Sequence, residues 1–318
     1  MCMTIKEKYI DPFTDFGFKQ IFGNENHKNI LISFLNDLLD IEHKIVSVEY
    51  RNLEQLGLNI VDRKAVYDIY CTDEKENNFI VELQRGKQKY FKDRSVYYTS
   101  FPIQEQSKKG TWDYSLKKIY FVGILEFELE NSNKEKYLSK VQLCDTQTNE
   151  IFYDKLTYYY IEMPKFKKTE KELSNHLEYW LYYLNNLNNL NKIPESFKED
   201  KILNEAFDIA EFLALDDDKQ FAYQQDLKAR NDYKNVLDFA VENATEYGLK
   251  QGMEKGMEKG MEKGMEKGME KGKIEGKIEG IQEEKLSIAR NAISQGFDNK
   301  TISLITSLPI QIIENLQK

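Results

Sequence analysis

Hydrophobic residues recur at helical spacing within the first forty positions of the chain. In the segment DPFTDFGFKQIFG, residues 11–23, either Thr14 or Asp15 is a candidate N-cap of a short helix that Gly23 would end. A second, amphipathic helix is predicted over residues 29–40, because apolar side chains return there every three or four positions. These side chains are Leu31, Phe34, Leu35, Leu38 and Leu39.

Runs of β-branched and aromatic residues then predict a series of strands. The run at 118–127 is almost wholly apolar, as expected of a strand that is covered on both faces. Residues 90–107 have a helical pattern, and the chain becomes wholly helical from about residue 170. This succession of elements predicts a mixed α/β fold with a helical second half. The strand-like runs are 46–52, 65–71, 79–84, 118–127, 137–145 and 155–166.

A glycine recurs every four residues from Gly252 to Gly280, in GMEK and GKIE repeats. A four-residue period drifts by about 40° per repeat around a helix of 3.6 residues per turn, so no face stays apolar. Each glycine costs about 1 kcal/mol of helix stability relative to alanine, whereas methionine, glutamate and lysine favour helix. We therefore interpret residues 248–282 as a marginal, exposed helix or linker that serves as a spacer.

Residues 283–318 predict two or three short helices, because Gly296, Asp298 and Pro309 mark helix ends and starts. The apolar residues here fit a module that is loosely like a helix-turn-helix, and they fit a helical oligomerisation cap as well. We favour the cap, and hence a homodimer through the C-terminal helices. The expected core of this module is Ile302, Ile305, Leu308, Ile312 and Ile313.

The composition predicts a cytoplasmic protein without a membrane partner. Hydrophobic residues make up 41% of the chain, enough for a core, and no apolar run has the length of a membrane span. Three cysteines without a CxxC motif indicate reduced thiols, not a disulfide framework or a zinc site. The net charge of −9 argues against indiscriminate coating of nucleic acid, so any such contact must come from local basic patches.

Two of the strand-like runs each carry an acidic residue where a strand ordinarily holds an apolar one. Because side chains alternate along a strand, Glu82 and Gln84 share one face of the run FIVELQ. If this run pairs as a hairpin with AVYDIYC, Asp68 and Glu82 can face the same side of the sheet. The simpler alternative is an edge hairpin whose acids reach solvent.

Buried carboxylates in close approach repel one another, and neither ionises cheaply. A divalent cation such as Mg²⁺ resolves both problems, since it prefers a few hard oxygen ligands and retains waters. A metal ion held in this way activates water and stabilises a phosphoryl transition state. The hairpin is therefore a candidate metal site.

A resemblance to a known family rests on a series of short motifs in a fixed order. The chain resembles the PD-(D/E)XK nuclease superfamily, specifically its family of transposases and recombination-promoting nucleases. The resemblance covers essentially the whole chain and implies a restriction-endonuclease-like core over residues 1–168, with a mixed central sheet flanked by helices. A helical extension over 169–247, the spacer and the small C-terminal module would follow. The motifs are DPFTDFGFKQIFG, ILISFLNDLL, YDIYC with FIVELQ, DRSVYY, KIYFVGIL, IEMPKF and NEAFDIAEF.

The resemblance also implies roles for individual residues. Asp68 and Glu82 would be the two motif acids and the ligands of Mg²⁺ or Mn²⁺. Gln84 stands where the superfamily more often has lysine, although glutamine is usual in this transposase family. Glutamine can only hydrogen-bond, so the attacking water would depend more on the metal. Asp15 and Lys19 match the N-terminal signature and would point at the site, although a surface ion pair explains them equally well.

A basic segment follows the second motif acid directly. It contains a single acid, Asp93, and its aromatic residues are interleaved with the charges. Such a patch beside a metal site would supply sequence-independent affinity for DNA phosphates. An ordinary solvated charge run is the alternative. The basic residues are Arg85, Lys87, Lys89, Lys92 and Arg94.

The candidate metal site and the resemblance together predict a metal-dependent DNA endonuclease, and the resemblance implies that it acts in transposition or recombination of mobile elements. One rival is a catalytically weak or inactive DNA-binding or assembly protein that retains the nuclease fold. Another is a helical scaffold whose active part is the repeat tail.

Overall fold

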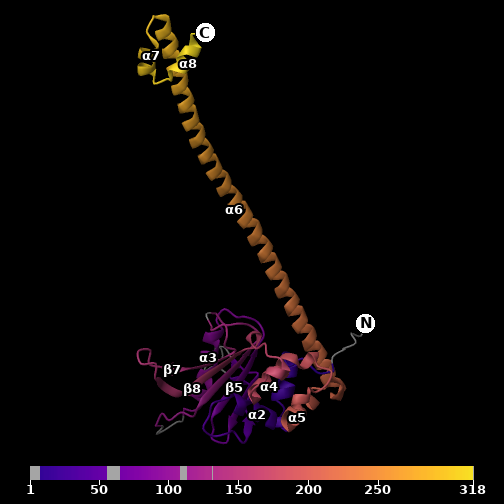
Figure 1. Ribbon diagram of the computed structural model, residues 1–318. Coiled ribbons are helices and arrows are strands. Elements are labelled where there is room, and N and C mark those ends of the chain that lie inside the picture. The colour runs from indigo at the N-terminus through magenta and orange to yellow at the C-terminus, as the bar shows by residue number, and fades with distance from the viewer. Residues whose placement is uncertain (1–7, 56–64, 108–112, 131, 318) are drawn as a thin grey trace. The chain divides into compact units, whose positions relative to one another are not determined.

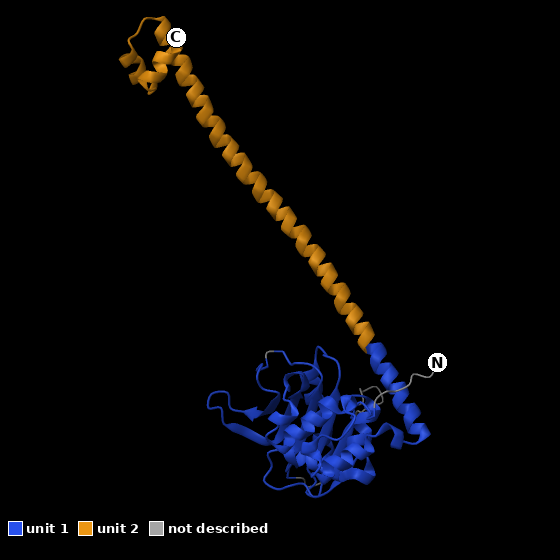
Figure 2. Cartoon of the chain, turned by 45° about the vertical axis from the view of Figure 1, so that its right-hand side comes forward, with its two compact units in different colours: residues 1–233 blue, residues 234–318 orange. Residues whose placement is uncertain are grey.

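The computed structural model describes residues 8–55, 65–107, 113–130 and 132–317. The chain divides into two units, residues 1–233 and residues 234–318, and each is described by itself (Figure 2). The boundaries expected at residues 168, 247 and 282 stay a prediction.

The first unit is built on a mixed six-stranded sheet (Figure 1). The order across it is β1 (Val48–Tyr50), β4 (Ile69–Asp73), β5 (Asn78–Gln84), β6 (Ile119–Leu125), β8 (Ile151–Glu162) and β7 (Leu138–Cys144). Neighbours among β5, β6 and β8 are parallel, and the other neighbours are antiparallel. Every residue of β5 and β6 is buried, as befits strands with a covered surface on both sides. A separate small sheet pairs β2 (Glu54–Gln55) with β3 (Ala65–Val66).

Helices cover both faces of the central sheet. Phe79, Val81 and Leu83 of β5 belong to a hydrophobic core shared with α1 (Asp15–Phe22), α2 (Lys28–Leu38), α4 (His176–Asn186) and α5 (Lys201–Ile209). Ile80 belongs to a second core, on the opposite face, shared with α3 (Phe91–Glu105). The predicted alternation along β5 is therefore confirmed, and it sends Glu82 and Gln84 toward the α3 side.

Helix α1 begins and ends where its sequence predicts. The hydroxyl of Thr14 accepts a hydrogen bond from the backbone N–H of Gly17 at 2.9 Å, which makes Thr14 the N-cap, and Gly23 is the C-cap. A Cβ at Gly17 would lie 2.1 Å from the carbonyl oxygen of Asp11, so this close turn requires glycine. Short 3₁₀ turns connect the other elements, at Glu25–His27, Met163–Lys165, Glu170–Glu172, Leu187–Asn189, Glu195–Phe197 and Phe212–Ala214.

The second unit contains the distal part of α6 (Asp217–Ser294), α7 (Asn299–Thr306) and α8 (Ile310–Leu316). The repeat is helical and exposed throughout, as predicted. The expected core of the small module is partly wrong: Ile302, Leu308 and Ile313 are buried, but Ile305 and Ile312 are exposed. On the short helix α7 the inward position one turn after Ile302 is residue 306, a buried threonine, so residue 305 points outward.

The α/β class with a mixed sheet, flanking helices and a long helix followed by small ones is confirmed. Within the described ranges, none of the helices combines the length and apolar character that a membrane span needs.

Candidate active site

The two motif acids lie together at the end of the β4–β5 hairpin. The sequence pattern predicted one continuous strand over residues 65–71, and this is wrong. Asp68 occupies a bend between β3 and β4. Glu82 lies in β5 and is 3% exposed. The backbone N–H of Asp68 donates to Glu82 Oε1 at 3.1 Å, and the backbone N–H of Leu83 donates to Asp68 Oδ2 at 2.7 Å. Each carboxylate is thus held by a backbone amide of the facing segment.

Burial and mutual repulsion set the protonation of this pair. Burial is the largest cause of the raised pKa of Glu82, and repulsion by Asp68 adds to it. Burial also raises the pKa of Asp68, against the hydrogen bond from Leu83, which lowers it. Asp15 raises the pKa of Asp68 further, so a third carboxyl group acts on this pair. A pair of acids whose ionised forms are disfavoured in this way is a typical feature of a functional site.

Helix α1 contributes the two residues of the N-terminal signature. Lys19 Nζ forms an ion pair with Asp15 at 2.9 Å across one helical turn. Both charges act on the pKa of Asp68, Asp15 raising it and Lys19 lowering it, so the pair is electrostatically part of the site. Asp15 and Asp68 line the same cleft of about 400 Å³, together with Gln84 and Arg85. Lys19 lines a neighbouring cleft of about 740 Å³.

Gln84 is buried, and its side-chain amide is already engaged. Its Nε2 donates to the carbonyl oxygen of Gly86 at 3.2 Å, and its Oε1 accepts from Arg94 Nη1 at 3.3 Å. Arg94 also forms an ion pair with Glu82 at 3.5 Å, from Nη2 to Oε2. The guanidinium of Arg94 therefore contacts two of the predicted site residues.

Acidic partners from distant parts of the chain reach the basic segment that follows Gln84. Arg85 pairs with Asp226 of α6 at 3.6 Å, and Lys87 pairs with Glu130 at 3.0 Å. Lys89 lies over the ring of Tyr90, 5.4 Å from its centroid, and Lys92 is exposed. Two of the positive charges of this segment are therefore partly neutralised by acids that lie outside it.

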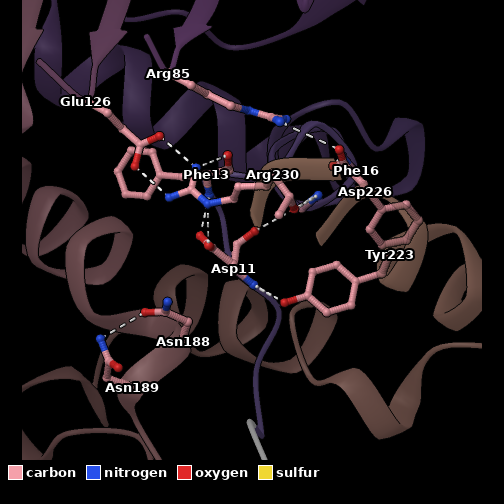
Figure 3. Close-up of polar contacts among 12 residues, drawn as sticks. Asp11, Phe13, Phe16, Arg85, Glu126, Asn188, Asn189, Tyr223, Asp226 and Arg230 are labelled. Atoms are coloured by element: carbon pink, nitrogen blue, oxygen red, sulfur yellow. Dashed lines mark hydrogen bonds and ion pairs between the residues drawn. The ribbon is translucent and has the colours of Figure 1, made fainter. Parts of the chain in front are cut away.

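The beginning of α6 also contributes to the site, although no sequence pattern predicts it. Figure 3 shows its polar contacts around Arg230. The guanidinium of Arg230 makes two hydrogen bonds of 2.7 Å to the carboxylate of Glu126, which follows β6. It also bonds the carbonyl oxygen of Phe13 at 2.8 Å and pairs with Asp11 at 3.1 Å. Arg230 thereby ties the segment that leads into α1 to the end of the central sheet.

Two neighbouring residues of α6 reinforce this attachment. The hydroxyl of Tyr223 accepts from the backbone N–H of Asp11 at 2.8 Å, and Asp226 accepts from the backbone N–H of Phe16 at 2.8 Å. Tyr233, one turn after Arg230, lies so close to Gly86 that a Cβ there would stand 2.5 Å from its hydroxyl. Arg230 and Tyr233 line the cleft with Asp68.

Two carboxylates that repel one another in a buried setting fit a hard divalent cation that keeps several waters. Over the stretches that the structure describes, no group of three or more histidine, cysteine, aspartate or glutamate side chains is arranged to hold a metal ion. The donor set is therefore sparse, as Mg²⁺ sites often are.

The model of one protein family matches residues 12–240, and its description is PD-(D/E)XK nuclease family transposase. The chain belongs to this family. No curated protein and no solved structure matched the chain. The matched residues of this PD-(D/E)XK transposase contain Asp15, Asp68 and Glu82, and they extend through Arg230. Membership implies a nuclease, hence phosphodiester hydrolysis, in transposition.

Proposed function

We propose that this protein is a metal-dependent DNA endonuclease whose site is built on Asp68 and Glu82. The observation that supports it is the reciprocal arrangement of these acids, each fixed by a backbone amide, with Asp68 lining a cleft. A purely structural hairpin would gain nothing from facing two buried carboxylates toward each other, because desolvation and repulsion both oppose folding. The proposed setting is transposition or recombination of mobile elements.

Asp68 and Glu82 would hold Mg²⁺ or Mn²⁺. When bound, the ion would lower the pKa of a water molecule and stabilise the charge that develops on the phosphate. Gln84 lies on the same strand face as Glu82 and is fixed by Gly86 and Arg94, which leaves one N–H and one lone pair of its amide to orient a water molecule. Asp15 would add a third carboxylate to the cleft, and Lys19, which lines the neighbouring cleft, would be available to a phosphate when its pair with Asp15 opens.

DNA would lie along the basic segment next to the cleft. Lys87, Lys89 and Lys92 have exposed side chains, and Tyr90 is exposed beside them. Such groups supply phosphate neutralisation that does not depend on base sequence. Arg85 and Arg94 were predicted to join them, and both are tied to acids of the site wall in this fold.

A plasmid-nicking assay with and without Mg²⁺ tests the function. Asp68→Ala should abolish Mg²⁺-dependent nicking while circular dichroism shows an intact fold. Glu128→Gln, an exposed acid outside the cleft, is the matched control and should nick at the wild-type rate. Nicking that continues in Asp68→Ala, or that is unaffected by chelation of metal, would contradict the proposal.

The second candidate is a catalytically weak or inactive DNA-binding or assembly protein. The state of Gln84 favours it, because its side-chain amide already bonds Gly86 and Arg94 within the protein. In that case Asp68→Ala would leave every measurable activity, including DNA binding, unchanged. We further propose a homodimer through the C-terminal helices, since Leu304, Ile305 and Phe297 are exposed there. Sedimentation of the full chain beside a Leu304→Glu variant tests this association.

A further inference from the structure

Arg94 contacts the motif acid Glu82 from helix α3, whereas Glu82 itself lies in strand β5. It lies in the first turn of α3, on the face of the sheet that Glu82 and Gln84 share. Its Nη2 lies 3.5 Å from Glu82 Oε2, and its Nη1 donates to Gln84 Oε1 at 3.3 Å. Among the residues that the structure describes, it is the one cation paired with either Asp68 or Glu82.

The guanidinium is held in place from several sides. It stacks over the ring of Tyr98, with its central carbon 4.7 Å from the centroid, and Nη1 donates to Gln88 Oε1 at 3.0 Å. Tyr98 itself is fixed, because its carbonyl oxygen accepts from the hydroxyl of the buried Tyr67 at 2.9 Å. Arginine in such a setting loses little further freedom when it binds an anion, since its planar fork is preorganised.

The position also remains open to a ligand. The side chain of Arg94 is 33% exposed, whereas that of Glu82 is 4% exposed. A guanidinium carries five N–H donors, more than the three oxygens that it contacts here. It can therefore keep its contact with the site and still present donors outward to a phosphate.

Positive charge beside the reacting phosphate favours phosphodiester hydrolysis. Negative charge develops on the phosphate oxygens in the transition state, and preorganised cations or donors stabilise it. Residue 84 is a glutamine, which has no charge to offer. Arg94 contacts that glutamine directly, so its charge stands next to the position where a lysine would place its own.

We propose that Arg94 is a catalytic residue that supplies, from helix α3, the positive charge that residue 84 lacks in strand β5. It contacts the phosphate under attack and does not serve chiefly as part of the DNA-binding patch. This inference rests on the proposed nuclease function. It predicts an effect on the rate of cleavage of bound DNA, whereas a patch residue such as Lys89 changes affinity and its salt dependence.

The experiment compares single-turnover cleavage of a duplex at saturating protein with DNA affinity measured by fluorescence anisotropy in EDTA. Arg94→Gln should lower the cleavage rate by about 100-fold, the usual effect of losing one transition-state donor. Its dissociation constant for DNA should stay within about threefold of the wild-type value, a minor change on the logarithmic scale of affinity. Lys140→Gln, on the far edge strand β7 and paired with Asp40, should match the wild type in both measurements.

A charge-relocation variant distinguishes catalysis from a structural role. The double variant Gln84→Lys/Arg94→Gln moves the positive charge from α3 to strand β5. Its cleavage rate should be at least tenfold higher than that of Arg94→Gln. Arg94→Lys should retain part of the rate, since it keeps the charge without the fork. Thermal melting of each variant shows whether it is folded, and the double variant remains informative if Arg94→Gln alone melts early.

Several results would overturn the inference. If folded Arg94→Gln cleaves DNA at the wild-type rate, or loses only affinity for DNA, then Arg94 is a DNA-binding residue and not a catalytic one. A higher rate together with tighter Mg²⁺ binding would show that Arg94 competes with the metal ion. A folded double variant without recovery would show that charge is not its contribution. A wild-type protein with no nuclease activity would instead overturn the proposed function, and this inference with it.

Discussion

The backbone N–H of Asp68 donates to Glu82 Oε1 at 3.1 Å, so a local main-chain contact fixes two acids that repel each other. This arrangement fixes the geometry of the two acids, but it lowers the stability of the folded protein when Glu82 is ionised. The raised pKa of Glu82 means that its ionisation opposes folding. Stability should therefore fall as pH rises from about the ordinary value of 4.5 through the raised pKa.

Glu82→Gln should increase the free energy of unfolding at pH 8 while removing nuclease activity. We expect a gain on the order of 1 kcal/mol, since one pKa unit corresponds to about 1.4 kcal/mol. Urea denaturation at pH 5 and pH 8 checks this, because the gain should be smaller at the lower pH. Glu128→Gln is the control. Equal stability of wild type and Glu82→Gln at pH 8 would contradict the repulsion argument.

Magnesium should stabilise the wild-type protein and leave Asp68→Asn unaffected. A ligand that binds only the folded state adds about 2.7 kcal/mol at a hundred times its dissociation constant. Thermal melting in Mg²⁺ and in EDTA measures the difference without reference to cleavage. An equal rise in Tm for both proteins would place the metal ion elsewhere.

Arg230→Ala should detach the beginning of α6 from the sheet. The side chain has four contacts of 3.1 Å or less and is 22% exposed, so we expect a loss of about 2 kcal/mol, below the 3–5 kcal/mol typical of a fully buried pair. Limited proteolysis should then cut within residues 217–233. Lys228→Ala, an exposed residue of the same helix, should change neither measurement. Unaltered stability and proteolysis in Arg230→Ala would show that the attachment does not depend on this side chain.

Replacing Gly256, Gly260 and Gly264 by alanine should strengthen the repeat helix. A Cβ at these positions meets no atom within 4 Å, so each change is free of clashes and adds about 1 kcal/mol of helix stability. Amide hydrogen exchange across the repeat should slow accordingly. Gly296→Ala is the opposite case, because its φ of +81° suits glycine, and it should destabilise the second unit. Unchanged exchange in the triple variant would argue against a marginal helix.

His176 should make stability depend on pH in the alkaline range. Its ring bonds Asp37 through Nδ1 and Asp200 through Nε2, and the bond to Asp37 is the largest cause that raises the pKa of His176 to about 9. Because the folded-state pKa is raised, the stabilisation is complete below pH 6.5 and is lost as pH rises through about 9. Denaturation of Glu82→Gln with and without His176→Gln measures this contribution apart from that of Glu82. His43→Gln, at an exposed histidine, should not alter the pH dependence.

Local signals in the sequence were sufficient for most of the fold. Alternation in FIVELQ placed Glu82 and Gln84 on one face, and the hydroxyl of Thr14 capped α1 as expected. Both depend on neighbours a few residues apart. The bend at Asp68 was missed, because β-branched and aromatic residues on both sides of it resemble an uninterrupted strand.

The long-range part of the site had no such signal. Arg230 meets Glu126 across 104 positions and Phe13 across 217, and nothing near any of the three residues indicates the pairing. Arg94 was predicted only as one charge in a basic run. Its contact with Glu82 depends on how α3 packs on the sheet, which periodicity within α3 does not determine.

Residues 8–11 contact residues about two hundred positions later in the chain, and this affects the order in which contacts can form during synthesis. The backbone N–H of Ile10 donates to the carbonyl oxygen of Ala210, and that of Phe212 donates to the carbonyl oxygen of Lys8. Asp11 forms an ion pair with Arg230. At 5–20 residues per second, roughly 10–40 s separate the emergence of Asp11 from that of Arg230. The segment before α1 therefore cannot be secured by Arg230 until most of the first unit has been synthesised. The contacts that secure α1 are therefore among the last of the first unit to become available during translation.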